Sequence, residues 1–303
     1  LFLLILLYCG CHQLSTGYSI RVNLKGTGTA DSLYLSRYIG SRIERIGTTP
    51  LSTGIAEFSG AIPLKPGMYI TGIEGKGKID FLINNSLSQH FKISADLGNI
   101  ASTLTFQGSP ENSAFADYLV FMENCGKQRK ELQQRMWHVS ESPDSINKIN
   151  KSLLRLIEEM GTRAEKIQQL FPGSMLALYT RLTRETAVPE PVIPPGIANR
   201  ELFMLEYRYH YTSAHFFDPV DFSDPQILSL PVFEEKLGFY FHQLVPAIPD
   251  TMKVKVENVV EMARQNNEVY IHTVKYLYRM FREPAIPEYM PVSDFIGENY
   301  ILT

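Results

Sequence analysis

Several features that would point to a function are scarce in this sequence. Its 303 residues include three cysteines and one tryptophan, and the formal net charge is -3. The small net charge gives no broad electrostatic attraction to nucleic acid, so we expect no nucleic-acid partner. No run of 18 or more apolar residues occurs, so no segment is predicted to span a bilayer.

Catalytic signatures are absent as well. The sequence has no G-x-S-x-G, H-E-x-x-H or C-x-x-C motif. The pairs Gly26-x-Gly28 and Gly75-x-Gly77 lack the Lys-Ser/Thr of a phosphate-binding loop, and they lie between alternating runs where hairpin turns belong. We therefore assign no catalytic residue, cofactor or metal ligand, and we expect no enzyme activity from this chain alone. A hydrolase whose residues converge only in space is a weaker alternative.

The composition that is present is that of a globular protein. Hydrophobic residues make up 44% of the chain and charged residues 20%, with 17 phenylalanines and 16 tyrosines. This is enough apolar mass for a sizeable core, and the length suggests about two domains.

Residues 18–108 are predicted to form a β domain. The stretch YSIRVNLK alternates apolar and polar residues, which is the pattern of a half-buried strand. Six or more short runs follow at spacings of about 10 to 15 residues, with Gly, Asn or Pro between them. The Thr/Gly/Pro-containing stretch between SLYLSRYI and IAEFSGAI is predicted to be a loop. The pattern indicates an antiparallel β-sandwich or an open barrel.

From residue 109 the pattern becomes helical, so the fold class is α+β. Residues 109–186 carry two long amphipathic repeats that predict a helical hairpin, and Ser174 is the expected N-cap of a third helix. Four prolines in residues 187–196 predict a stiff linker. Residues 197–303 are predicted to be an all-helical module. One of its helices is expected to run from Pro231 to Val245, the next to be capped by Asp250, and the last to run from Glu268 to Arg282. We expect this module to be truncated at its C-terminus.

The beginning of the chain allows three interpretations. An apolar run, Leu1–Tyr8, is followed by C-G-C, and the second cysteine is Cys11. The run could be a buried strand, the C-x-C could bind a soft metal, or Cys11 could carry a lipid. The run has the length of a signal-peptide apolar region, and only His12 lies close by as a further metal ligand. We favour lipid attachment at Cys11, with residues 1–11 as a partial lipoprotein signal.

Cys125 is the one cysteine that remains after the lipid-attachment signal. A lone thiol forms no intramolecular disulfide, and no histidine lies near it in the sequence. We predict a small, half-buried residue on a helix, without a redox role.

Acidic residues and histidines are the remaining candidates for metal ligands. Asp218, Asp221 and Asp224 do not have the spacing of an EF-hand, and two of them precede proline, so we predict turn and helix caps. His210 and His215 lie five apart, which does not suit two ligands on one helix face. Four further histidines are predicted to be hydrogen-bonded surface or core residues and not ligands: His90, His138, His242 and His272.

Two stretches carry a resemblance to a known group of proteins. They are FQGSPEN at Phe106–Asn112 and FDPVDFSDPQILSLPVFEEKL at Phe217–Leu237. With the lipobox-like start, the small β domain and the helical hairpin, they resemble the N-terminal regions of Gram-negative envelope lipoproteins. Those two-part regions have no characterised function and commonly precede a TlpA/ResA-like thioredoxin domain. The resemblance covers about residues 9–303.

The resemblance implies an exported protein on the periplasmic side of a membrane, most often the outer membrane, held there by its lipid. It also implies that the redox chemistry belongs to a thioredoxin domain, which this chain lacks. We therefore expect a non-catalytic region that anchors, spaces or presents substrate to such a domain in cis. The alternative is a stand-alone surface lipoprotein that binds a peptide or a glycan.

Overall fold

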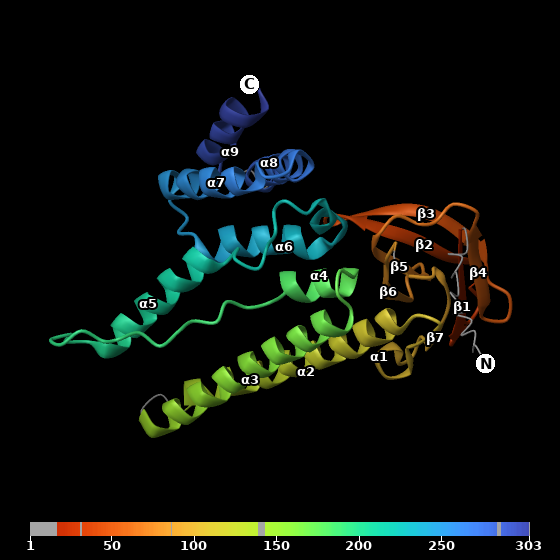
Figure 1. Ribbon diagram of the computed structural model, residues 1–303, viewed down its shortest axis with the longest axis horizontal. Coiled ribbons are helices and arrows are strands. Elements are labelled where there is room, and N and C mark those ends of the chain that lie inside the picture. Colours follow the sequence, from red (N-terminus) through yellow and green to blue (C-terminus); the bar gives the residue numbers. More distant parts are fainter. Residues whose placement is uncertain (1–16, 31, 86, 139–142, 284–285, 303) are drawn as a thin grey trace, which may run out of the picture.

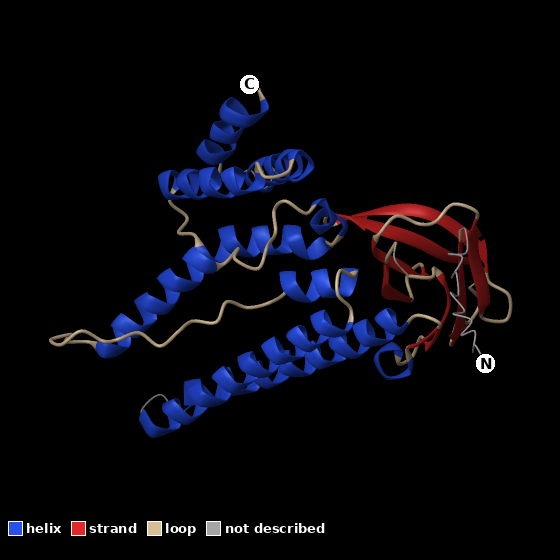
Figure 2. Cartoon of the chain, in the orientation of Figure 1, coloured by secondary structure: helices blue, strands red, loops and turns tan. Residues whose placement is uncertain are grey.

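Alternation of apolar and polar residues builds the N-terminal part of the molecule. The computed structural model describes residues 17–30, 32–85, 87–138, 143–283 and 286–302. Its strands all lie at one end of the molecule, and helices make up the rest (Figures 1 and 2). The strands are β1 (Tyr18–Lys25), β2 (Ser32–Ile39), β3 (Arg42–Pro50), β4 (Ile55–Gly60), β5 (Gly67–Ile73), β6 (Gly77–Ile83), β7 (His90–Asp96) and β8 (Thr105–Gln107).

The strands form two four-stranded sheets, in the orders β4-β1-β7-β8 and β3-β2-β5-β6. The α+β class and the sandwich are therefore confirmed. One pair departs from the antiparallel expectation, because β1 runs parallel to β7, with Ile20 opposite Phe91. These two strands lie far apart in the sequence, so no hairpin imposes an antiparallel arrangement on them.

Two local predictions about the β domain were wrong. The stretch predicted as a loop contains β3, an edge strand whose side chains are largely exposed, such as Ile43 at 54%. A strand without a buried face carries little alternation, so its pattern is weak. The Gly26-x-Gly28 segment is not a hairpin turn, since it connects β1 to β2 in the other sheet. Gly75-x-Gly77 does lie in a hairpin, between β5 and β6.

The predicted helical hairpin is present in the structure. Helix α2 (Pro110–His138) and helix α3 (Pro143–Leu170) lie side by side and lead away from the sandwich (Figure 1). The short helix α1 (Ile100–Thr103) precedes β8. Helix α4 (Met175–Leu182) begins as predicted, because the Ser174 side chain accepts a hydrogen bond of 3.0 Å from the Ala177 amide.

The remaining helices follow an irregular connector over residues 183–199. They are α5 (Arg200–His215), η1 (Pro225–Ser229), α6 (Pro231–Phe239), η2 (Tyr240–Leu244), α7 (Pro249–Ala263), α8 (Asn267–Arg282), α9 (Met290–Ile296) and η3 (Gly297–Ile301). In the part of the chain that is described, no helix is long and apolar enough to cross a membrane.

The structure corrects three helix boundaries. The helix expected over Pro231–Val245 changes at Tyr240 into the π-helix η2. Helix α7 begins at Pro249, with Ile248 as its N-cap, instead of being capped by Asp250. The helix that ends at Arg282 is not the last one, since α9 and η3 follow it.

One sheet of the sandwich contributes to both hydrophobic cores. On the inner face of the β3-β2-β5-β6 sheet, Leu33 and Phe81 pack in the sandwich core. On its outer face, Met68 and Leu82 belong to the core of the helical region. Successive residues of a strand point to opposite faces, so β5 and β6 bind the two regions together.

The FQGSPEN segment joins the sandwich to the helices. Phe106 packs in the sandwich core, and the buried Asn112 side chain exchanges two hydrogen bonds with the backbone of Leu82, at 2.7 and 2.9 Å. The neighbouring buried carboxylate of Glu111 accepts the amide of Leu176 at 2.9 Å, at the start of α4. This segment is therefore a structural joint, and its polar residues have structural partners.

We predict that Asn112→Ala lowers the free energy of unfolding by about 2–3 kcal/mol, because the buried amide and carbonyl of Leu82 lose their partners. The exposed Asn147→Ala in α3 is the matched control, with an expected change within about 0.5 kcal/mol. Urea denaturation followed by circular dichroism measures both. Equal losses of stability in the two variants would show that the Asn112 hydrogen bonds do not stabilise the connection between sandwich and helices.

Candidate functional site

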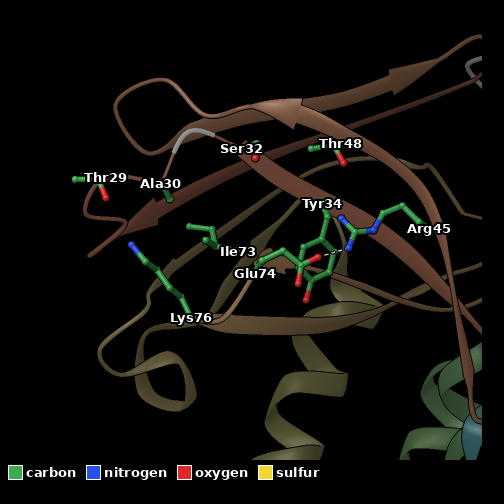
Figure 3. A pocket seen from close by; sticks show the side chains of 9 residues that line it. All are labelled: Thr29, Ala30, Ser32, Tyr34, Arg45, Thr48, Ile73, Glu74 and Lys76. Carbon is green, nitrogen blue, oxygen red and sulfur yellow. Dashed lines mark hydrogen bonds and ion pairs between the residues drawn. The ribbon is translucent and has the colours of Figure 1, made fainter.

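A polar pocket lies on the outer face of the β3-β2-β5-β6 sheet, beyond the part that the helices cover. Its volume is about 240 Å³. The side chains that line it come from β2, β3, the end of β5, the β1–β2 connection and the β5–β6 turn (Figure 3): Thr29, Ala30, Ser32, Tyr34, Arg45, Thr48, Ile73, Glu74 and Lys76.

Tyr34 forms one wall of this pocket. Leu33 and Leu35 point into the sandwich core, so Tyr34 between them points outward. Its partner on β5 is Gly72, where an added Cβ would lie 3.1 Å from the tyrosine hydroxyl. The absence of a side chain at Gly72 therefore lets the ring lie close to the sheet. Partial burial, and then the nearby carboxylate of Glu74, raise the pKa of Tyr34.

Charged side chains surround that ring. The Arg45 guanidinium lies 4.3 Å from the ring centre of Tyr34 and forms an ion pair with Glu74. Lys76 lies across the pocket, and its ammonium donates a hydrogen bond of 2.5 Å to the Thr27 carbonyl. Among the lining residues that the structure describes, two cations and one carboxylate leave an excess of one positive charge.

The two glycine pairs of the sequence meet at this pocket. Gly75 has a φ of +73° in the turn closed by the Lys76 amide and the Ile73 carbonyl, and it separates Glu74 from Lys76. Gly28 has a φ of +61°, and an added Cβ there would lie 3.0 Å from the Lys76 ammonium. Both positions favour glycine because other residues rarely adopt a positive φ. The sequence placed these turns separately, and only the fold brings them together.

Helix α5 is the second notable surface. It has no buried residue, although it carries many large apolar side chains. Leu202, Leu205 and Tyr209 are 49%, 66% and 37% exposed. Figure 1 shows α5 and the connector before it extending away from the β-sandwich. Large exposed apolar side chains grouped on one element are typical of an interaction surface.

An aromatic row runs along α5 at helical spacing. The rings of Tyr207 and Tyr211 are 5.9 Å apart, and those of Tyr211 and His215 are 4.2 Å apart and stacked. Tyr209 donates a hydrogen bond of 2.8 Å to the Leu244 carbonyl. The Tyr209 bond connects the C-terminal half of α5 to η2, while Leu202 and Leu205 in the N-terminal half stay exposed.

A buried carboxylate connects the sandwich to the helical region away from the pocket. Glu234 of α6 is 1% exposed and accepts the Ser41 amide at 2.8 Å. It also accepts the Ser41 hydroxyl, and its other oxygen lies 2.7 Å from His272 Nε2 of α8. Gly40 and Ser41 form the two-residue turn between β2 and β3, and the Gly40 amide donates to the Leu228 carbonyl at 3.1 Å.

This cluster holds a serine, a histidine and a carboxylate, but its geometry is not that of a hydrolase triad. Ser41 and His272 bond to different oxygens of Glu234, so the carboxylate lies between them, whereas a nucleophilic serine needs its hydroxyl on the histidine. Burial would raise the pKa of Glu234, but the hydrogen bonds from His272 and Ser41 outweigh it and hold that pKa below its ordinary value of 4.5. The cluster is a structural junction.

The aspartates act mainly as predicted. Asp221 accepts hydrogen bonds from the amide and the hydroxyl of Ser223, and Asp224 caps η1 by accepting the Gln226 amide at 2.9 Å. Asp218 instead pairs with His215 Nδ1 at 2.8 Å. Among the residues described, no group of three or more His, Cys, Asp and Glu side chains is placed to hold a metal ion.

His272 is a hydrogen-bonded histidine, as predicted, and its partner is the buried Glu234. The structure corrects one further prediction. Cys125 is a free thiol that is buried and not half-buried. Its burial is the main cause that raises its pKa, and the negative charge of the nearby Glu159 raises it further. Cys11 lies outside the described residues, so lipid attachment there stays a prediction.

Comparison with known protein families gives one match. Residues 124–287, more than half of the chain, match the family of a domain of unknown function, DUF5106. The chain belongs to the DUF5106 family. No curated protein and no solved structure matched it. The DUF5106 segment contains α3 to α8 and the C-terminal half of α2, and thus both α5 and Glu234. The pocket belongs to the sandwich that precedes this segment.

Sequence reasoning missed the junction between DUF5106 and the sandwich. Glu234 lies in the stretch L-P-V-F-E-E-K-L, among apolar residues that are expected in the core. A charged residue at such a position was the available sign of a buried carboxylate with polar partners. Nothing in the sequence relates it to Ser41, which is 193 residues away.

We predict that Gly40→Ala lowers the free energy of unfolding by about 2 kcal/mol or more, for two reasons. Gly40 has a φ of +58°, and an added Cβ would clash with the Glu234 carboxylate. Gly47→Ala in β3 is the control, since nothing lies within 4 Å of a Cβ added there, and it should be nearly neutral. Urea denaturation measures both variants. An unchanged free energy of unfolding for Gly40→Ala would refute the close contact between Gly40 and Glu234.

We also predict that stability depends on Glu234 in acid. Because its folded pKa is lowered, its contribution is complete above pH 4.5 and is lost as the pH falls through the folded value. Glu234→Gln should unfold about 3 kcal/mol more easily at pH 7 and should show a shallower loss of stability below pH 4.5. The exposed Glu158→Gln should keep the wild-type acid profile. Denaturant titrations from pH 3 to pH 7 provide the measurement.

Proposed function

We propose that this DUF5106 protein is a non-catalytic spacing and substrate-presenting region of an envelope lipoprotein related to thiol-disulfide oxidoreductases. A lipid on Cys11 would hold it on the periplasmic side of the outer membrane. A TlpA/ResA-like thioredoxin domain in cis would supply the redox chemistry, and its protein substrates would be the partners.

The exposed helix α5 supports this proposal most directly. Its sixteen residues include none that is buried, and their apolar side chains would lower their free energy by covering part of another polypeptide. Unfolded substrates of thiol-disulfide exchange expose apolar segments, so an accessible helix with leucine and tyrosine side chains is suited to hold them.

The joints to the sandwich support a spacing role. The buried side chains of Glu234 and Asn112 each connect a helix to a backbone amide of the sandwich, at Ser41 in the β2–β3 turn and at Leu82 in β6. Buried and satisfied polar contacts favour one relative placement of the packed elements. The sandwich and the helices therefore act as a spacer that keeps α5 at a set distance from the strands.

Binding of an unfolded polypeptide tests the proposal. We expect the full chain to bind fluorescently labelled, reduced and carboxymethylated α-lactalbumin with a micromolar dissociation constant, measured by fluorescence anisotropy. Leu205→Asp should weaken binding about tenfold, because it places a charge at the centre of the exposed face. A second titration with a purified thioredoxin domain of the TlpA/ResA type measures the partner in cis.

The matched control is Leu154→Asp on α3. Leu154 is also an exposed leucine, at 55%, but it lies on the helical hairpin instead of α5. Wild-type binding by this variant would locate the surface on α5. Absence of binding to both probes, or equal losses in both variants, would refute presentation by α5.

A second candidate function is the binding of a glycan or a peptide by a stand-alone lipoprotein. The polar pocket at Tyr34 favours the glycan, because hydroxyl and charged side chains dominate its lining.

A further inference from the structure

We propose that the pocket bounded by Tyr34, Arg45, Glu74 and Lys76 binds one acidic sugar unit, a saccharide ring that carries a single carboxylate. The inference goes beyond the role of α5 and does not depend on it. It develops the glycan-binding candidate by naming the site and the chemical class of ligand.

The size of the pocket limits the ligand. Its 240 Å³ lies below the range of about 300–1,000 Å³ that drug-sized ligands occupy. A single sugar ring is a ligand of suitable size, while a folded protein partner or a long peptide would need a groove. The pocket opens on the sheet surface, so the unit could be one residue of a longer glycan.

The lining matches the hydroxyl groups of a sugar. Thr29, Ser32 and Thr48 bring hydroxyls that both donate and accept hydrogen bonds, and Glu74 brings a carboxylate that accepts them. Ala30 supplies a small apolar surface for the C–H groups of a sugar ring, while the lining residue Ile73 is buried in the sandwich core. Figure 3 shows these groups around one concavity, with Glu74 between Tyr34 and Lys76.

The charged side chains of the pocket favour a ligand with a single negative charge. The Lys76 ammonium has three N–H donors. One donates to the Thr27 carbonyl, so two stay available for a ligand carboxylate. Glu74 is paired with Arg45, which leaves Lys76 as the excess positive charge among the described lining residues. One ammonium neutralises one carboxylate, whereas a dianion such as phosphate would keep one unpaired negative charge in the pocket, so the pocket favours a sugar carboxylate.

The charged groups are already positioned before a ligand arrives. Arg45 is held by its ion pair with Glu74 and by the Tyr34 ring, and the Gly75 turn sets the separation of Glu74 and Lys76. Groups held in place lose less conformational entropy on binding. This arrangement makes even a small, polar pocket capable of specific, weak binding.

Titration with simple sugars tests the proposal. We expect D-glucuronate to bind the full chain with a millimolar dissociation constant, measured by chemical-shift changes in two-dimensional NMR spectra. D-Glucose should bind at least tenfold more weakly, because it lacks the carboxylate. The shifted resonances should include Ser32, Thr48 and Lys76.

Variants of matched charge separate this site from general electrostatic attraction. Lys76→Gln should weaken glucuronate binding about tenfold and leave the thermal midpoint unchanged. Arg42→Gln removes the same charge from an exposed position of β3 outside the pocket and should bind like the wild type.

Three results would overturn the inference. They are the absence of saturable binding at tens of millimolar glucuronate, equal affinity for glucose and glucuronate, and displacement of glucuronate by an equal concentration of inorganic phosphate. The polypeptide titration with Leu205→Asp measures binding by α5 independently of the pocket. Failure of the sugar site is therefore distinguishable from failure of the spacing role.

Discussion

The buried carboxylate of Glu234 is the constraint on which the arrangement of the two regions depends. A charged group that is removed from water must be hydrogen-bonded to several partners, or it destabilises the fold by several kcal/mol. Glu234 finds its partners on Ser41 in the sandwich and on His272 in α8, so its charge is satisfied only when three separate elements meet. The lack of a side chain at Gly40 allows the turn to come close enough.

The outer face of the β3-β2-β5-β6 sheet shows how the junction shapes function. At one end the face is covered by helices, and Met68 and Leu82 join the helical core. At the other end it stays open, and Tyr34, Arg45 and Thr48 line the pocket. At the covered end, Tyr38 also packs against the helical core and donates a hydrogen bond of 3.0 Å to Asp80. One sheet thus serves both as a packing surface for the DUF5106 segment and as the wall of a polar site.

The two proposed sites lie on different regions of the chain and call for different ligands. Helix α5 offers apolar and aromatic side chains on a long exposed element, which suits an extended polypeptide. The pocket offers hydroxyls and one excess positive charge, which suits a small polar ring. A chain that uses both sites would contact a protein and a glycan at separate places.

The sequence by itself determined the elements that have a strong period or a strong cap. Alternation in YSIRVNLK predicted β1, and Ser174 predicted the start of α4, because these signals act over a few neighbouring residues. It missed β3, whose exposed side chains carry no alternation, and it missed the end of α6 at Tyr240. Only the tertiary structure decided that β1 and β7 are parallel, that Glu234 meets Ser41, and that two glycine turns meet at one pocket. Each of these contacts joins residues far apart in the chain, so their partners are set by how whole sheets and helices pack, and no local pattern specifies them.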